Sequence, residues 1–387
     1  MNDTYLNIIA FNTPYPANYG GVIDVFYKLK ALHDCGFKIV LHTFEYGRKQ
    51  APELEQYCDQ VFYYKRKTGW LSQLSTKPYI VRSRRNKDLY TRLLSNDYPI
   101  LFEGLHTCCY LNDPVFADRM KMVRTHNIEH DYYRGLARNT SSVFLKAYFR
   151  YEAFRLEKYE KQLRHADRLL TLSTTDQTYF ESLYGKDKTV YCPLFFQQEQ
   201  SQRIDPEPFV LFHGDLSNWE NINAALFLIR SVASMDDSVQ WVFAGRNPHP
   251  SLLRSAGSYK NISVKGNLPE VEMNRLLCEA KVNVLYTNQI SGVKLKLLNV
   301  LTRGWFCLAT PEMLKGSGLE DLCELIESND PSQILNTVKK CLAAPFPPAE
   351  LEKRKDRFES IYNNNKNALK IKEYLIMEQS KNRKDSI

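Results

Sequence analysis

The segment Leu6–Phe44 reads LNIIAFNTPYPANYGGVIDVFYKLKALHDCGFKIVLHTF. Its two ends, Leu6–Phe11 and Phe37–Phe44, are short apolar runs of the kind that form buried strands. Between them, Val22–His33 carries apolar residues at helical spacing, and Gly36 follows as a stop signal. A strand, a helix and a second strand in this order predict a βαβ unit with parallel strands.

The same alternation of strand-like and helix-like segments continues along the chain. Further strands are expected, in order, at Val61–Tyr64, Ile100–Glu103, Met120–Thr125, Arg168–Leu172, Thr189–Cys192, Phe209–His213, Gln240–Ala244, Ile262–Val264, Val282–Tyr286, Trp305–Ala309 and Leu322–Ile326. Helices are expected between them, the clearest at Val143–His165, Trp219–Val232, Glu270–Glu279, Gly292–Arg303 and Pro331–Cys341. This alternation predicts an α/β fold built on doubly wound parallel sheets.

Two changes in composition divide the chain. The segment Phe195–Pro208 is rich in glutamine and ends in prolines, and Pro345–Pro348 marks a second break. We therefore predict two Rossmann-like domains, residues 1–195 and 196–348, that face a central cleft. The remaining residues, 349–387, are expected to form a polar helix that packs back across the first domain.

The composition is that of a globular protein. Of the 387 residues, 43% are apolar and 25% are charged, which argues against a disordered chain, a collagen-like fibre and a disulfide scaffold. No apolar run approaches the roughly 18 residues of a membrane span, and the first ten residues do not resemble a signal peptide. Nine cysteines without a C-x-x-C spacing indicate reduced thiols and a cytoplasmic location.

The net charge of +8 is concentrated in one segment. Tyr63–Arg92 contains nine basic residues and one acidic residue, and the rest of the chain is balanced. Apolar side chains lie among the cations, namely Trp70, Leu71, Leu74, Tyr79 and Ile80. This pattern suits the anionic inner face of a membrane, although a solvated loop and helix face would read the same way. No zinc-finger, RNP or helix-turn-helix signature supports binding to nucleic acid.

In open α/β sheets, ligands bind in the loops at the carboxyl ends of the strands. The first such loop ends in Gly20 and Gly21, at the start of a helix. Two glycines there allow an anion to approach exposed backbone N–H groups. The spacing matches neither the dinucleotide fingerprint nor the P-loop, so a plain turn is the alternative interpretation.

A second loop reads RTHNIEH and begins at Arg124. His126 directly follows a strand, where a histidine can hydrogen-bond a sugar hydroxyl or take part in acid–base chemistry. The alternative is a structural histidine whose hydrogen bonds are satisfied within the protein, and His106 and His130 are weaker candidates. The string HNIEH has the spacing of an inverted zinc-protease motif. Its place in a loop and the absence of an evident third ligand argue against zinc.

Three further segments of the second domain are candidates for binding phosphate or sugar. Gly214 follows a strand and precedes a helix whose start carries a capping box, Ser217 to Glu220. Arg246 follows the next strand and can pair with phosphate, stack on a base or form a surface salt bridge. In the expected helix Gly292–Arg303, one face carries Gly292, Lys296, Asn299 and Arg303, either as a diphosphate site or as the polar side of an amphipathic helix.

Taken in order along nearly the whole chain, these motifs resemble the retaining glycosyltransferases of the GT-B fold, in particular the glycosyltransferase family 4 type. They are the early Gly-Gly loop, R-x-H-N-x-E, the Gly214 turn, Ala-Gly-Arg and G-x-x-x-K-x-L-[EN]. The resemblance implies a nucleotide-sugar donor bound mainly by the second domain and an acceptor bound by the first. It also implies that no metal and no cofactor are needed.

The resemblance assigns roles to individual residues. His126 would contact the transferred sugar and support its developing positive charge, and Lys296 would stabilise the diphosphate leaving group. The donor would further be contacted by Gly20, Gly21, Gly214, Arg246, Gly292 and Asn299, and the acceptor side would include Glu103, His106, Asn127 and Glu129. Asn299 stands where the family has a glutamate that bonds the ribose. The family's earlier glutamate corresponds to Ser291, so the E-x7-E pair is absent.

The expected function is transfer of a sugar, with retention, from a UDP- or GDP-sugar to a glycan or lipid-linked glycan, in the biosynthesis of cell-surface polysaccharide. The basic segment Tyr63–Arg92 suggests that the enzyme is peripheral to the inner face of the membrane. Two alternatives are a nucleotide-sugar epimerase of the same fold and a catalytically degenerate GT-B protein that serves as a binding partner or scaffold. The second is favoured by Ser291 and Asn299.

Overall fold

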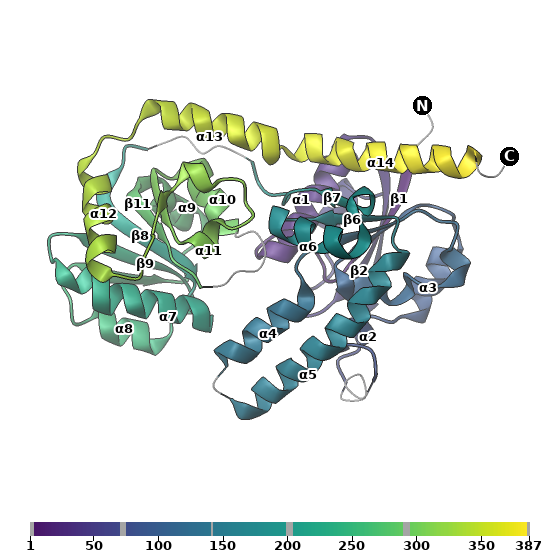
Figure 1. Ribbon diagram of the computed structural model, residues 1–387, viewed down its shortest axis with the longest axis horizontal. Coiled ribbons are helices and arrows are strands. Elements are labelled where there is room, and N and C mark those ends of the chain that lie inside the picture. Colours follow the sequence, from purple (N-terminus) through teal and green to yellow (C-terminus); the bar gives the residue numbers. More distant parts are fainter. Residues whose placement is uncertain (1–3, 70–74, 141, 199–203, 289–294, 385–387) are drawn as a thin grey trace. The chain divides into compact units, whose positions relative to one another are not determined.

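The computed structural model describes residues 4–69, 75–140, 142–198, 204–288 and 295–384 (Figure 1). The chain forms two compact units. Unit 1 comprises Met1–Gln197 and the returning segment Tyr362–Ile387, and unit 2 comprises Gln198–Ile361. Each unit is built around one parallel sheet with helices packed against it.

The sheet of unit 1 has its strands in the order β3-β2-β1-β4-β5-β6-β7, and all neighbours are parallel. Their bounds are β1 Thr4–Ala10, β2 Phe37–Glu45, β3 Gln60–Lys65, β4 Ile100–Glu103, β5 Lys121–Thr125, β6 Arg168–Thr171 and β7 Thr189–Tyr191. The central strands β1, β4 and β5 are buried, which explains the mostly apolar sequences of β1 and β4. The strand order reverses between β1 and β4, and this switch point is where ligands bind in such sheets.

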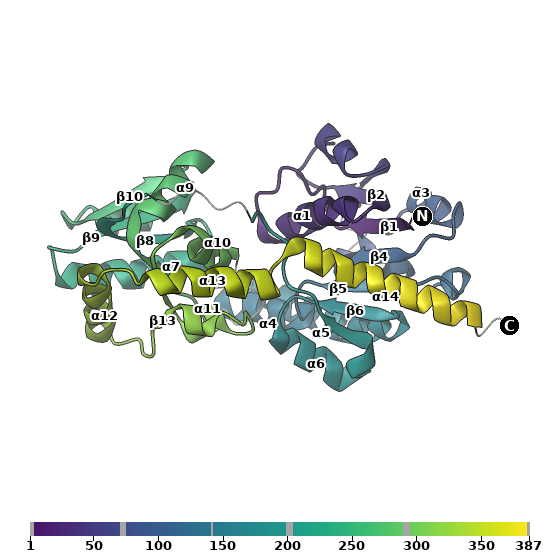
Figure 2. The same cartoon turned by 90° about the horizontal axis from the view of Figure 1, so that it is seen from above.

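The helices of unit 1 flank its sheet. They are α1 Gly20–Asp34, α2 Tyr79–Arg82, α3 Lys87–Leu94, α4 Glu129–Asn139, α5 Val143–Glu160, α6 Thr174–Tyr184 and α14 Asn364–Lys384. The C-terminal helix α14 packs on α1, as Figure 2 shows, and it contributes Ile371 and Leu375 to the same apolar core as Leu29 and Leu32. The last helix of the chain is therefore part of the first domain.

The sheet of unit 2 has the strand order β10-β9-β8-β11-β12-β13, again all parallel. The strands are β8 Glu207–Asp215, β9 Gln240–Arg246, β10 Ile262–Gly266, β11 Ala280–Leu285, β12 Phe306–Ala309 and β13 Glu324–Leu325. The helices are α7 Trp219–Phe227, α8 Pro250–Ala256, α9 Glu270–Glu279, α10 Leu295–Arg303, α11 Pro311–Leu314, α12 Pro331–Ala343 and α13 Pro348–Ile361. The order reverses between β8 and β11, which places the switch point of unit 2 at the carboxyl end of β8.

The two doubly wound parallel sheets confirm the fold class expected from the sequence. The end of the chain differs in detail, because the expected single helix is divided into α13, in unit 2, and α14, in unit 1. Tyr362 lies at the break with its side chain fully buried, and its ring meets the ring of Phe196 edge to face. Asn364 donates to the Phe196 carbonyl over 2.8 Å and accepts from its N–H over 3.3 Å. These contacts bury the break between α13 and α14 against Phe196.

Candidate active site

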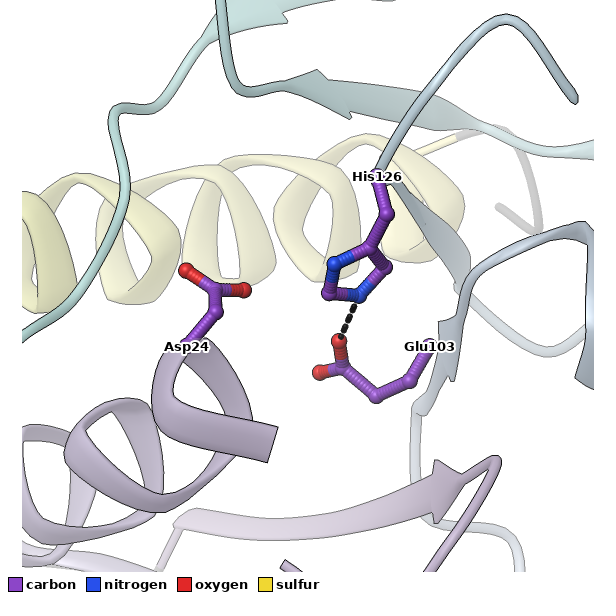
Figure 3. A group of neighbouring side chains, drawn as sticks. All are labelled: Asp24, Glu103 and His126. Atoms are coloured by element: carbon purple, nitrogen blue, oxygen red, sulfur yellow. Dashed lines mark hydrogen bonds and ion pairs between the residues drawn. The ribbon is translucent and has the colours of Figure 1, made fainter. Parts of the chain in front are cut away.

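The candidate site of unit 1 lies at the carboxyl ends of β1, β4 and β5, on both sides of the switch point. Glu103 is the last residue of β4, and His126 directly follows β5. Helix α1 begins after the β1 loop and carries Asp24 and Lys28 one turn apart, both fully buried. Figure 3 shows the side chains of Asp24, Glu103 and His126 converging from these three elements.

A chain of hydrogen bonds and ion pairs joins these side chains. The Nε2 atom of His126 lies 3.0 Å from Oε2 of Glu103, and because a carboxylate only accepts, Nε2 carries the proton (Figure 3). The Lys28 ammonium lies 2.8 Å from Oε1 of Glu103 and 3.0 Å from Oδ2 of Asp24. In the neutral imidazole, Nδ1 of His126 is left as a hydrogen-bond acceptor.

Arg124 closes the other end of this chain. Its guanidinium donates to both carboxylate oxygens of Asp24, over 3.0 and 2.7 Å, and to the carbonyls of Cys192 and Pro193. Asp24 also accepts from the backbone N–H of Phe195 over 2.9 Å. Two acids and two bases thus compensate one another inside unit 1, as buried charges require.

The charges of this cluster determine its protonation. Burial alone would raise the pKa of Glu103, but the Lys28 ammonium and the hydrogen bond from His126 outweigh it, so the pKa lies below its ordinary value. The same balance, with Arg124 and Lys28 as the cations, lowers the pKa of Asp24. Both groups are therefore carboxylates at neutral pH.

One oxygen or nitrogen from each of Asp24, Glu103 and His126 lies within 4.8 Å of the others, a grouping that could hold a metal ion. The Lys28 ammonium, however, bonds both carboxylates and takes the position between them that a cation would occupy. The negative charge that would attract a metal is thereby compensated by the protein itself.

The side chains of the HNIEH string turn to different partners. His126 bonds Glu103, Glu129 faces His106, and His130 lies 3.3 Å from a carboxylate oxygen of Glu160. Since these side chains do not converge, the geometry argues against the zinc interpretation of this spacing.

His106 and Glu129 form a second buried pair beside His126. The Nδ1 atom of His106 lies 3.8 Å from Oε1 of Glu129, and neither atom has a hydrogen-bond partner among the residues that the structure describes. Burial raises the pKa of Glu129 to about 8, although the Asn127 amide acts in the opposite direction. Burial and the Arg84 charge lower the pKa of His106. Both groups are therefore mainly neutral at pH 7, with open hydrogen-bonding capacity.

Glycines make room for the rings of this site. The ring of Phe11 lies 5.4 Å, centroid to centroid, from those of both His106 and His126. A Cβ atom at Gly21 would lie 2.7 Å from the Phe11 ring, whereas a Cβ at Gly20 would have no atom within 4 Å. Gly104 has a φ of +72°, and a Cβ there would lie 2.8 Å from Nδ1 of His106. Gly21 thus sets the position of Phe11, and Gly20 leaves the start of α1 open.

In unit 2, Lys296 reaches the switch point. It lies in the first turn of α10, and its ammonium is 3.4 Å from Oδ1 of Asn221. Asn221 in turn donates to the carbonyl of Asp215 over 3.0 Å and packs against Gly214, where a Cβ would come within 3.0 Å of its amide. Burial lowers the pKa of Lys296 to about 8, and Glu220 partly opposes the shift. A cation is thereby held at the carboxyl end of β8.

Two further donor-side candidates, Arg246 and Asn299, lie on β9 and α10. Arg246 lies at the end of β9 with its guanidinium 3.8 Å from the Asp215 carboxylate, and both side chains are exposed. Such a pair contributes little stability and leaves the cation accessible. The Oδ1 atom of Asn299 accepts from Arg303 over 3.2 Å, which leaves its amide N–H groups as donors. Gly292 and Ser291 lie outside the described residues.

Two expectations from the sequence need correction. Glu103 was assigned to the acceptor side, but it is fully buried and bonded to Lys28 and His126, so it positions the histidine. The basic segment Tyr63–Arg92 was expected to meet an anionic membrane surface or to form a solvated loop and helix face, and neither expectation fits one of its cations. Arg84 is only 4% exposed and donates to the carbonyls of Phe11 and Ile80, so it links the β1 loop to α2. Three apolar members of the segment fall outside the described residues, namely Trp70, Leu71 and Leu74.

The sequence interpretation missed four residues of these sites: Asp24, Lys28, Arg124 as the partner of Asp24, and Asn221. A signal for the first two was present, since Asp24 and Lys28 stand at i and i+4 among apolar residues of α1. A charged pair on the buried face of a helix indicates an internal ion pair.

The described helices include none long and apolar enough to cross a membrane.

Comparison with known proteins places the fold. No family model matches the chain. A curated relative, an uncharacterised 44.6 kDa protein in the cps region of Klebsiella pneumoniae, is 25% identical over 344 residues, which cover 84% of this chain and 87% of the relative.

Solved structures match nearly the whole length. Sucrose-phosphate synthase from Thermosynechococcus elongatus has a TM-score of 0.68 at 14% identity, covering 97% of this chain and 99% of its own. The Anabaena protein HepE, in complex with UDP and glucose, has the same TM-score and identity and covers 97% and 100%. TarM has a TM-score of 0.65 at 10% identity and covers 98% of both chains. These structural neighbours are GT-B glycosyltransferases, and with the two Rossmann-like sheets they confirm that the chain has the GT-B fold.

Proposed function

We propose that this protein is a retaining glycosyltransferase that moves a sugar from a nucleotide-sugar donor to a glycan acceptor. The observation that carries the proposal is the Lys296 ammonium, held by Asn221 at the carboxyl end of β8 beside the Gly214 turn. A cation fixed at a switch point is placed to bind a phosphate group.

On the donor side, Lys296 would bind the diphosphate of the nucleotide sugar. Negative charge grows on that diphosphate as the bond to the sugar breaks, and a positioned cation in a partly dry site stabilises it. Arg246 supplies a second, accessible cation for the nucleotide. The N–H groups of Asn299, which make no hydrogen bond within the described part of the chain, would donate to the ribose in place of the glutamate that the family has there.

On the acceptor side, His126 and the pair of His106 and Glu129 would handle sugar hydroxyls. Glu103 fixes the tautomer of His126, so that Nδ1 can accept from a hydroxyl of the transferred sugar. The orphaned atoms of His106 and Glu129 are 3.8 Å apart. One hydroxyl oxygen can lie about 2.8 Å from both, so this pair is suited to hold an acceptor hydroxyl.

Two comparisons support the substrate class. The structure of HepE contains UDP and glucose, which favours a UDP-sugar as the donor for the protein described here, with a GDP-sugar as the alternative. The Klebsiella pneumoniae relative lies in a cps region, which favours a role in cell-surface polysaccharide biosynthesis. We therefore propose that the acceptor is a glycan carried on a lipid.

The test is a transfer assay with the purified full-length chain, a panel of UDP- and GDP-sugars, and glycan acceptors with short lipid tails. The expected result is acceptor-dependent release of nucleotide, with the anomeric configuration of the donor retained in the product by NMR. Conversion of the donor without acceptor would instead identify an epimerase. Donor binding without any turnover across the panel would support a degenerate, scaffold-like protein.

A further inference from the structure

Helices α4 and α5 of unit 1 pack against each other as a hairpin, and Figure 1 shows the pair extending away from the sheet. Helix α5 exposes an unusual number of large apolar side chains for a surface helix. In its first turn Val143 is 77% exposed and Phe144 is 88% exposed. Further exposed side chains on this helix are Leu145, Tyr151 and Phe154. Isolated exposed apolar residues are ordinary, but a group on one helix marks an interaction site.

Three of the exposed side chains form one stripe. Phe144, Tyr151 and Phe154 stand at i, i+7 and i+10, which places them on the same face of α5. The opposite face is buried against unit 1 through Ala153 and Leu156. The helix is therefore already anchored on its inner side, and the outward apolar stripe is available to a partner.

Cations outnumber the exposed acids beside this stripe, and Glu157 of the same helix is paired with Arg134 over 2.8 Å. From Gly135 to Tyr151 the sequence contains Arg138, Lys146 and Arg150 and no acidic residue. Lys158 lies with its ammonium 4.2 Å from the centre of the Phe154 ring. Apolar side chains bordered by lysine and arginine are the pattern of a helix that lies in the plane of a membrane interface. The long cationic side chains reach the headgroups while the rings enter the acyl boundary.

We propose that the exposed face of α5 docks on the surface of an anionic phospholipid bilayer. A second copy of this chain is a poorer occupant, because it would bring two sets of like charges together. The proposal rests on the proposed function, since a lipid-linked acceptor lies at such a surface. Helix α4 starts at Glu129, three residues after His126, so docking of the hairpin would hold the acceptor-side residues close to the bilayer.

The test is co-sedimentation of the full-length protein with vesicles of phosphatidylglycerol and phosphatidylcholine, and with vesicles of phosphatidylcholine alone. We expect binding to the anionic vesicles that weakens as salt is added, because surface charges are screened. Val143→Ser with Phe144→Ser should reduce the partition coefficient about tenfold or more. The matched control is Val271→Ser in unit 2, where the valine is 79% exposed.

A second arm tests the charge. Arg150→Glu should weaken binding to anionic vesicles, whereas Arg254→Glu, which makes the same change at an exposed site of unit 2, should not. Equal binding by wild type and by the Val143/Phe144 variant would overturn the proposal. So would a concentration-dependent dimer that this variant dissociates. Turnover of a water-soluble acceptor is measured in parallel: vesicle binding without turnover would leave the docking surface standing and count against the proposed function.

Discussion

The ammonium of Lys28 lies 2.8 Å from Oε1 of Glu103, and neither side chain is exposed to solvent. This ion pair links helix α1 to the end of β4 and keeps Glu103 ionised next to His126. The arrangement explains why unit 1 keeps four charged side chains in its interior, although their desolvation costs free energy. These are the side chains of Asp24, Lys28, Glu103 and Arg124. A fixed carboxylate behind the histidine determines which ring nitrogen carries the proton.

Lys28→Met should lower the free energy of unfolding by about 3–5 kcal/mol, because it leaves the buried carboxylate of Glu103 without a cation. Urea denaturation of the full-length protein measures the change. Lys30→Met, at an exposed position of the same helix, is the control and should have little effect. Adding Glu103→Gln to Lys28→Met removes the orphaned charge and should recover part of the loss. If Lys28→Met alone were as stable as wild type, the Lys28–Glu103 pair would not have this role.

Lys296→Ala should lower kcat by about 10²–10³-fold with the fold intact, as expected when one charge-stabilising group is removed from a transition state. Circular dichroism and the transfer assay are measured on the same preparation. Lys265→Ala removes an exposed lysine from β10 and should leave kcat unchanged. If Lys265→Ala lost as much activity as Lys296→Ala, the loss would not be specific to Lys296.

The pH dependence of the reaction should report the same lysine. Burial lowers the pKa of Lys296 to about 8, so the cation needed to bind diphosphate is lost as the pH rises through that value. We expect kcat/KM to fall above about pH 8, since this ratio reports groups of the free enzyme. In Lys296→Arg the side chain stays charged, so the alkaline limb should move upward or disappear. An unchanged limb would assign it to another group.

Glu129 should make the stability of the protein depend on pH. Its pKa is raised from 4.5 to about 8, so the folded state holds a proton that the unfolded state releases. The protonated Glu129 side chain contributes its full stabilisation below about pH 4.5, and this stabilisation is lost as the pH rises toward 8. The total loss is about 1.4 kcal/mol for each unit by which the pKa values of the folded and unfolded states differ. Glu129→Gln keeps a neutral side chain and should flatten the unfolding free energy between about pH 5 and pH 8. A curve identical to wild type would rule out the protonated carboxyl.

Gly21→Ala should displace the ring of Phe11, because the new Cβ would lie 2.7 Å from it. Crowding of this kind costs about 1–3 kcal/mol, and it should also lower turnover because Phe11 packs on His106 and His126. Gly20→Ala is the natural control, since the neighbouring position has no atom within 4 Å of the Cβ. Thermal unfolding and turnover of the two variants give the comparison.

The sheets could be predicted from the sequence because parallel strands buried on both faces leave uninterrupted apolar runs. Each expected strand is present, with its ends within two residues of the prediction. The division of the last helix was not predicted, because what interrupts it is the contact of Tyr362 and Asn364 with Phe196, more than 160 positions earlier. Such long-range pairing leaves no local pattern.

The candidate site was predicted only in part, for the same reason. The sequence indicates which loops follow the strands. In the structure, Lys296 lies beside the Gly214 turn and His126 lies at the end of β5. The partners of His126 could not be found from spacing, since Glu103 precedes it by 23 positions and Arg124 bonds Asp24 across 100. The burial of Arg84 likewise depends on a carbonyl of the β1 loop, which no count of charges along the chain can detect.

The position of α14 has a consequence for synthesis on the ribosome. Its residues Ala368, Ile371 and Leu375 belong to the apolar core of unit 1, whose strands are translated first. The described strands and helices of unit 2 lie between Gln198 and Ile361, so all of them are translated before α14. The core of unit 1 therefore becomes complete only after the whole of unit 2 has been translated, and until then the apolar positions that α14 covers have no partner.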